Sequence, residues 1–100
     1  MKIQVLDEAE DDLQDGREFY ERQEPGVGDY FAAALAADID SLILFAGIHP
    51  VEFGFHRALS KRFPFGVYYQ VGNAVIRIYA VLALRRDPAW IRRRLTTGER

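Results

Sequence analysis

Two β-rich segments on either side of Gly72 and Asn73 constrain the fold of this chain more than any other feature. Apolar residues alternate through residues 65–71, and residues 75–84 are apolar at nearly every position. A glycine–asparagine pair between two such runs is a strong signal for a tight β-hairpin. A nearly unbroken apolar run is typical of a strand covered on both faces. We therefore predict a β-hairpin whose second arm is the central strand of a sheet.

The chain before this hairpin has the pattern of two helices. The first is predicted from Asp7 to Gln23, with acidic residues in its first turn and apolar residues at helical spacing. The second begins between residues 26 and 29 and ends at Gly47. The link of glutamate, proline and glycine between them is short, so the two helices should form an antiparallel hairpin. We expect the acidic residues on its outer face to be solvated surface.

Shorter elements complete the chain. Residues 2–6 alternate as in a short strand, and after Pro50 the apolar period changes from that of a helix to that of a strand. The pattern over residues 53–63 is too mixed to assign its faces. Asp87 followed by Pro88 predicts the start of a last helix, whose Ile91 and Leu95 could pack back on the sheet. We expect residues 96–100 to be a frayed tail.

These elements predict one α+β domain over residues 1–100. The order is strand, helix, helix, strand, strand, strand and short C-terminal helix, with the helical hairpin packed on one face of a mainly antiparallel sheet. The other face, or the end of the sheet, should be open and basic.

Composition narrows the chemistry further. A chain of 100 residues is one domain, and with no cysteine it can have neither disulfides nor thiolate metal ligands. His49 and His56 are its only histidines, without an acid at ligand spacing, so we expect no metal site and no cofactor. We interpret His49, beside Pro50, as a loop residue. The chain has no signal-like start and no apolar stretch of about 20 residues, so we expect a cytoplasmic protein without a membrane segment.

Charge is distributed unequally along the chain. Residues 1–50 hold three basic residues against twelve acids, a net charge of −9, whereas residues 51–100 hold ten basic residues against three acids, a net charge of +7. Such an asymmetry indicates that the second half faces an anionic partner. The alternative is that acidic helices and basic strands neutralise each other within the fold.

Basic residues interleave with aromatic residues in the second half. Guanidinium groups bind phosphate in a bidentate manner, and aromatic faces can stack on unpaired bases. Alternatively, Tyr69 and Tyr79 lie in the core and some arginines pair with the acidic helices. We identify the candidate residues for binding a target or a phosphate as Arg57, Lys61, Arg62, Arg77, Arg85, Arg86, Trp90, Arg92 and Arg93.

Four segments of the chain are informative together: Pro25-Gly26-Val27-Gly28, the run from Arg57 through Phe63-Pro64-Phe65 to Tyr68-Tyr69, Ala80-Val81-Leu82, and Arg85-Arg86-Asp87-Pro88-Ala89-Trp90. With these segments the chain resembles the RelE/ParE family of toxins from bacterial type II toxin–antitoxin systems, over nearly its whole length. The resemblance implies a toxin that arrests growth, is neutralised by a cognate antitoxin in a hetero-oligomer, and is regulated through that complex.

The family divides by target. RelE-like members cut messenger RNA on the ribosome, and ParE-like members inhibit DNA gyrase. For the RelE-like activity, the resemblance implies the cations Arg57, Lys61, Arg85 and Arg86 as candidate catalytic residues, and His56 is the candidate substitute for the proton carrier.

Two positions depart from the RelE-like set, because Gly66 and Trp90 stand where an arginine and a tyrosine or histidine would be expected. Arginine is a poor base at neutral pH. We therefore favour ParE-like binding of gyrase through a basic sheet edge, with RelE-like cleavage of messenger RNA as the alternative.

Overall fold

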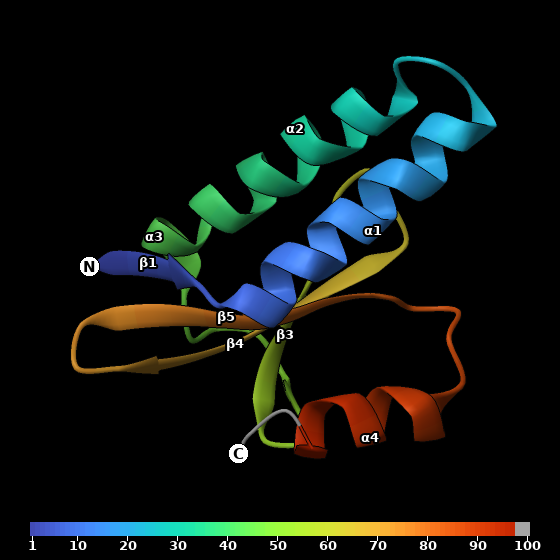
Figure 1. The fold of residues 1–100 in the computed structure, drawn as a ribbon. Coiled ribbons are helices and arrows are strands. Elements are labelled where there is room, and N and C mark those ends of the chain that lie inside the picture. Colours follow the sequence, from blue (N-terminus) through green and yellow to red (C-terminus); the bar gives the residue numbers. More distant parts are fainter. Residues whose placement is uncertain (98–100) are drawn as a thin grey trace.

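A computed structural model describes residues 1–97 of the chain as a five-stranded sheet with a helical hairpin on one face and a C-terminal helix on the other (Figure 1). The fold confirms the predicted α+β class. In chain order the elements are β1 (Lys2–Val5), α1 (Asp7–Gln23), α2 (Val27–Asp40), α3 (Leu42–Phe45), β2 (Val51–Glu52), β3 (Phe55–Leu59), β4 (Phe65–Gly72), β5 (Val75–Ala83) and α4 (Pro88–Thr97).

The sheet has the strand order β1-β5-β4-β3-β2. The predicted hairpin is confirmed as β4 and β5, which pair antiparallel from Phe65 opposite Ala83 to Gly72 opposite Val75. Its turn lies one residue later than the predicted Gly72-Asn73, because Gly72 still pairs in β4 and the positive φ angles fall at Asn73 and Ala74. Strand β1 pairs parallel with β5, and the other pairings are antiparallel. Strand β5 is therefore internal, as its apolar run predicts, but β4 rather than β5 is the middle strand. The register shifts at Tyr79, which has no opposite residue in β4.

Helices α1 and α2 cover one face of the sheet and bury most of the core. Phe31 and Leu35 of α2 are fully buried with Tyr69 of β4 and Ile78 of β5. Gly16 lets α1 approach closely, because a Cβ atom at this position would lie 2.5 Å from Cζ of Phe31.

Helix α4 covers part of the opposite face, where Ile91 and Leu95 pack with Phe55, Tyr68 and Leu82 (Figure 1). The predicted packing of Ile91 and Leu95 on the sheet is confirmed. The sequence predicted that either this face or the end of the sheet would be open and basic. Helix α4 covers part of this face, and the exposed arginines that follow β5 lie at the end of the sheet.

The single strand expected before the hairpin is divided into β2 and β3, and two element boundaries also differ from the sequence prediction. The second helix is interrupted at Ser41, whose hydroxyl donates a hydrogen bond to the carbonyl of Asp38 at 2.7 Å, and local bonds of this kind compete with regular helix geometry. The expected frayed tail is also wrong for its first residues, because α4 continues to Thr97 and the Thr96 hydroxyl bonds the Arg92 carbonyl at 2.9 Å. Residues 98–100 lie outside the described part. Within residues 1–97, no helix combines the length and apolar character that crossing a membrane requires.

Candidate functional site at the end of strand β5

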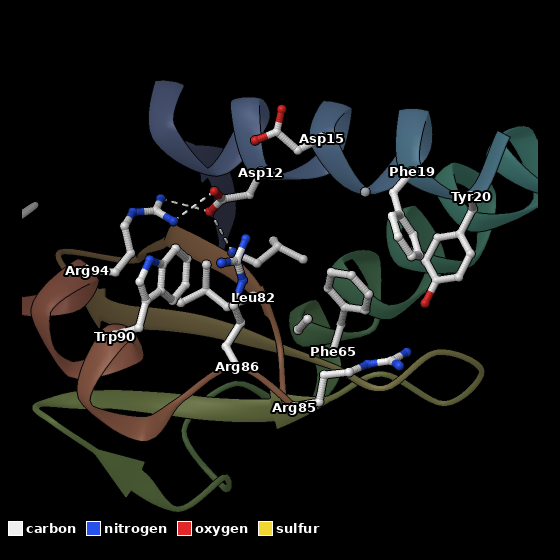
Figure 2. A pocket seen from close by; sticks show the side chains of 13 residues that line it. Asp12, Asp15, Phe19, Tyr20, Phe65, Leu82, Arg85, Arg86, Trp90 and Arg94 are labelled. Carbon is white, nitrogen blue, oxygen red and sulfur yellow. Dashed lines mark hydrogen bonds and ion pairs between the residues drawn. The ribbon is translucent and has the colours of Figure 1, made fainter. Parts of the chain in front are cut away.

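A cleft of about 440 Å³ lies between α1, the end of β5 and α4 (Figure 2). One wall is acidic and aromatic and belongs to α1, whereas the other is basic and belongs to the end of β5 and to α4. The residues around it are Asp12, Asp15, Gly16, Phe19, Tyr20, Phe65, Val81, Leu82, Ala83, Arg85, Arg86, Trp90 and Arg94.

Asp12 and Arg94 join the two walls through a bidentate ion pair. Both Asp12–Arg94 contacts measure 2.8 Å, and Oδ2 of Asp12 also accepts the backbone N–H of Val81 at 3.0 Å. The side chains are only 21% exposed for Arg94 and 12% for Asp12. Burial raises the pKa of Asp12, and the bonds from Arg94 and Val81 oppose that rise. The ion pair therefore closes one end of the cleft and ties α4 to α1.

Arg85 and Arg86 form the basic rim of the cleft. Both side chains are exposed, and neither takes part in an ion pair within residues 1–97. The Arg86 guanidinium lies over the Trp90 ring, 4.1 Å from its centroid, whereas Arg85 turns toward the side of Tyr20 (Figure 2). Strand β5 ends just before them, and the carboxylate of Asp87 caps α4 by accepting the N–H of Ala89 at 3.2 Å. The rim is thus held between two regular elements.

Arg57 lies outside this cleft, in β3 on the face of the sheet that α4 covers. A Cβ atom at Gly66 would lie 3.2 Å from Cγ of Arg57, so this glycine leaves room for the arginine stem to cross β4. The half-buried side chain has a buried Nε atom without a hydrogen-bond partner in the described part of the chain. Burial raises the pKa of the neighbouring Tyr68, and Arg57 opposes that rise.

His56 points to the other face, because consecutive residues of a strand alternate. Its ring stacks on Tyr69 with 5.1 Å between centroids, and its Nδ1 atom bonds the His49 carbonyl at 2.8 Å. His49 is a loop residue, as predicted, and its ring bonds the Tyr69 hydroxyl. The structure therefore does not bring His56 together with Arg57, Arg85 or Arg86.

The remaining candidate cations are dispersed. Lys61 and Arg62 are exposed beyond β3, and Arg62 bonds the Tyr30 hydroxyl at 3.2 Å. Arg77 is half-buried in β5 and bonds the Gly72 carbonyl at 3.4 Å. Arg92 and Arg93 are exposed on α4. Among the predicted residues, the cleft therefore combines Arg85, Arg86 and Trp90, and the others lie elsewhere.

The sequence interpretation missed Asp12 and the opposite wall of the cleft. Asp12 is not solvated surface, although acids on this helix were expected to be so. A signal was present, because Asp12 follows buried Ala9 by three residues and precedes buried Gly16 by four, which places all three on one helical face. The alternative that some arginines pair with the acidic helices is confirmed for Arg94.

Similarity to known proteins is visible in structure alone. No protein-family model and no curated protein matches the chain. A solved structure described as a chromosomal ParDE TA system from P. aeruginosa does match, with a TM-score of 0.78 and 19% sequence identity. The match covers 85% of this chain and 97% of that chain. The chain has a RelE/ParE-like fold.

At 19% identity the likeness concerns the fold, so function has to be argued from the residues of the cleft. In the described part of the chain, no group of three histidine, aspartate or glutamate residues is placed to hold a metal ion.

Proposed function

We propose that this protein is the toxin of a type II toxin–antitoxin system and that it arrests growth by binding DNA gyrase. The fold carries this proposal, because the superposition with a chain of a ParDE TA system extends over 97% of that chain. The proposed contact surface is the basic rim formed by Arg85 and Arg86, with Trp90 beside it.

The rim suits a binding surface. Arg85 and Arg86 are exposed and have no acidic partner within residues 1–97, so contact with an anionic partner does not first require an internal ion pair to break. Tryptophan and arginine, the residue types at the rim, are among those that dominate binding energy at protein interfaces. The stack of Arg86 on Trp90 holds both side chains in place before contact.

The position of His56 favours binding over RNA cleavage. Cleavage through a 2′-hydroxyl needs proton transfer beside the groups that hold the phosphate. His56 faces Tyr69 on the side of the helical hairpin, whereas Arg57 faces the side of α4. The predicted proton carrier and the predicted phosphate ligand are therefore separated by the sheet.

Two assays run in parallel with the purified protein test the proposed target. We expect it to inhibit supercoiling by gyrase and to trap gyrase–DNA cleavage complexes, while messenger RNA on translating ribosomes stays intact. Unchanged gyrase activity together with codon-phased RNA cuts would instead establish the RelE-like alternative.

An antitoxin partner is the second part of the proposal. We expect a small acidic protein expressed together with the chain to restore growth and to co-purify with it as a hetero-oligomer. The chain expressed alone should arrest growth. Normal growth with the folded chain present in cells at high level would contradict the proposed toxin activity.

A further inference from the structure

Strand β5 has a free edge inside the cleft. Strand β1 pairs with β5 only from Val75 to Ile78, so within residues 1–97 the later residues of β5 have a strand neighbour on one side only. Leu84 donates its N–H to Pro64, on the β4 side, at 2.9 Å. Backbone groups of alternate residues point to opposite edges of a strand, so the peptide groups of Val81 and Ala83 point away from β4 and toward α1.

Hydrogen bonds at this edge confirm the direction of these peptide groups and show which of them have no partner. Val81 donates its N–H to Asp12 at 3.0 Å, and the Ala83 carbonyl accepts the N–H of Arg86 at 3.2 Å. The Val81 carbonyl and the Ala83 N–H have no hydrogen-bond partner among residues 1–97. Both residues line the cleft of about 440 Å³.

The spacing of these two groups matches one kind of strand pairing. In a parallel ladder, one residue of the added strand donates to a carbonyl and accepts from the N–H two residues farther along. Val81 and Ala83 are two residues apart, on either side of Leu82. The same edge of β5 already carries a parallel strand, β1, at its beginning. An added segment would therefore continue the sheet where β1 leaves it.

We propose that the cleft binds an extended acidic segment of the antitoxin, parallel to β5, through the Val81 carbonyl and the Ala83 N–H. The identity of the partner rests on the proposed function, and the mode of binding rests on the strand edge. Strand β5 runs toward Arg85 and Arg86, whose guanidinium groups have no acidic partner within residues 1–97. The acidic residues of the segment follow its pairing residue and so reach these two groups. Phe19, which lines the opposite wall, gives an apolar side chain of the segment a surface to contact.

Two synthetic peptides of identical composition test the direction of binding. Both are acetylated and amidated; in one, valine and leucine residues precede two aspartates, and in the other the order is reversed. We expect the peptide with aspartates last to bind at least tenfold more tightly than the reversed peptide. Fluorescence of Trp90 and NMR of the labelled protein measure the affinity of each peptide. The Ala83 amide signal should shift as its N–H becomes bonded. Equal affinity for both orders, or no shift of the Ala83 amide at millimolar peptide, would overturn the proposal.

Methylation of the peptide backbone tests the hydrogen bond without altering the protein. Methylating the N–H that faces Val81 should abolish binding, whereas methylating the next N–H, which faces outward, should change affinity less than twofold. In the protein, Ala83→Pro removes the edge donor, and a folded variant should lose at least tenfold in affinity. Equal effects of the two methylations would contradict strand pairing. These readouts need neither gyrase nor toxicity, so loss of the target assignment and loss of this binding mode are distinguishable.

Discussion

Asp12 and Arg94 lie 82 positions apart in the sequence and form a bidentate ion pair with 2.8 Å contacts that joins the first long helix to the last. The same carboxylate accepts the N–H of Val81, so α1, β5 and α4 meet at one side chain. This junction forms one end of the cleft and sets the spacing between its walls.

Removing this carboxylate should destabilise the protein. We expect Asp12→Ala to lower the free energy of unfolding by about 2–3 kcal/mol, because it removes the ionic partner of the partly buried Arg94 guanidinium and the acceptor of the Val81 N–H. Asp12→Ala combined with Arg94→Leu should recover part of this loss, since no unpaired charge remains. Urea unfolding followed by circular dichroism measures both. Asp15→Ala, an exposed change one turn away, is the matched control and should stay within about 0.5 kcal/mol of the parent. Equal losses for Asp12→Ala and Asp15→Ala would show that the ion pair has no structural role.

Stability should fall in mildly acidic solution because of His49. Burial, and secondarily the charge of His56, lowers the pKa of His49 from its usual 6.5. Below pH 6.5 the unfolded chain therefore binds more protons at this residue than the folded protein does. The stabilisation is complete above that pH and is lost as the pH falls through the lowered pKa. Urea midpoints at pH 7.5 and 5.5 should show this loss for the parent and a smaller loss for His49→Asn. The same pH dependence in both proteins would exclude His49 as its source.

Two glycines should respond oppositely to the same change. Gly16→Ala places a Cβ atom 2.5 Å from the fully buried Phe31 ring, so we expect a loss of about 1–2 kcal/mol even though alanine favours the helix. Gly72→Ala has nothing within 4 Å and should be nearly neutral. Thermal unfolding of the two variants compares them directly. A stabilised Gly16→Ala variant would mean that α1 can move away from Phe31 at little cost.

Arg86 should affect the spectrum of the only tryptophan. Because its guanidinium covers the Trp90 ring at 4.1 Å, Arg86→Ala exposes the indole and should shift its emission to longer wavelength. Arg85→Ala removes the same charge from the neighbouring position but does not uncover the ring, and it should leave the emission maximum in place. Identical spectra for the two variants would show that the stack does not persist in solution.

Local patterns in the sequence predicted the hairpin of β4 and β5 and the start of α4, because Asn73 adopts the positive φ of a tight turn and Pro88 fixes the backbone at the first position of α4. The strand period also separates His56 from Arg57, since neighbouring residues of a strand face opposite ways. The sequence interpretation nevertheless grouped them as one site, and the structure places them on opposite faces.

Long-range contacts could not be predicted in the same way. Asp12 and Arg94 meet only after the whole sheet has formed, and one chain gives no covariation to connect them. The break at Ser41 coincides with a side-chain hydrogen bond inside an otherwise helical pattern, which the spacing of apolar residues does not reveal. The free edge of β5 could not be predicted for a similar reason, because it depends on where β1 stops pairing with β5.

Growth arrest by a double variant tests the central claim, that the rim of Arg85 and Arg86 carries the toxic activity. In an inducible strain, the account predicts that Arg85→Ala with Arg86→Ala abolishes growth arrest while the purified variant keeps the parent's circular dichroism spectrum. The matched control removes two exposed charges outside the cleft, through Lys2→Ala with Arg22→Ala, and should arrest growth like the parent. Full toxicity of the folded Arg85 and Arg86 variant would contradict the account.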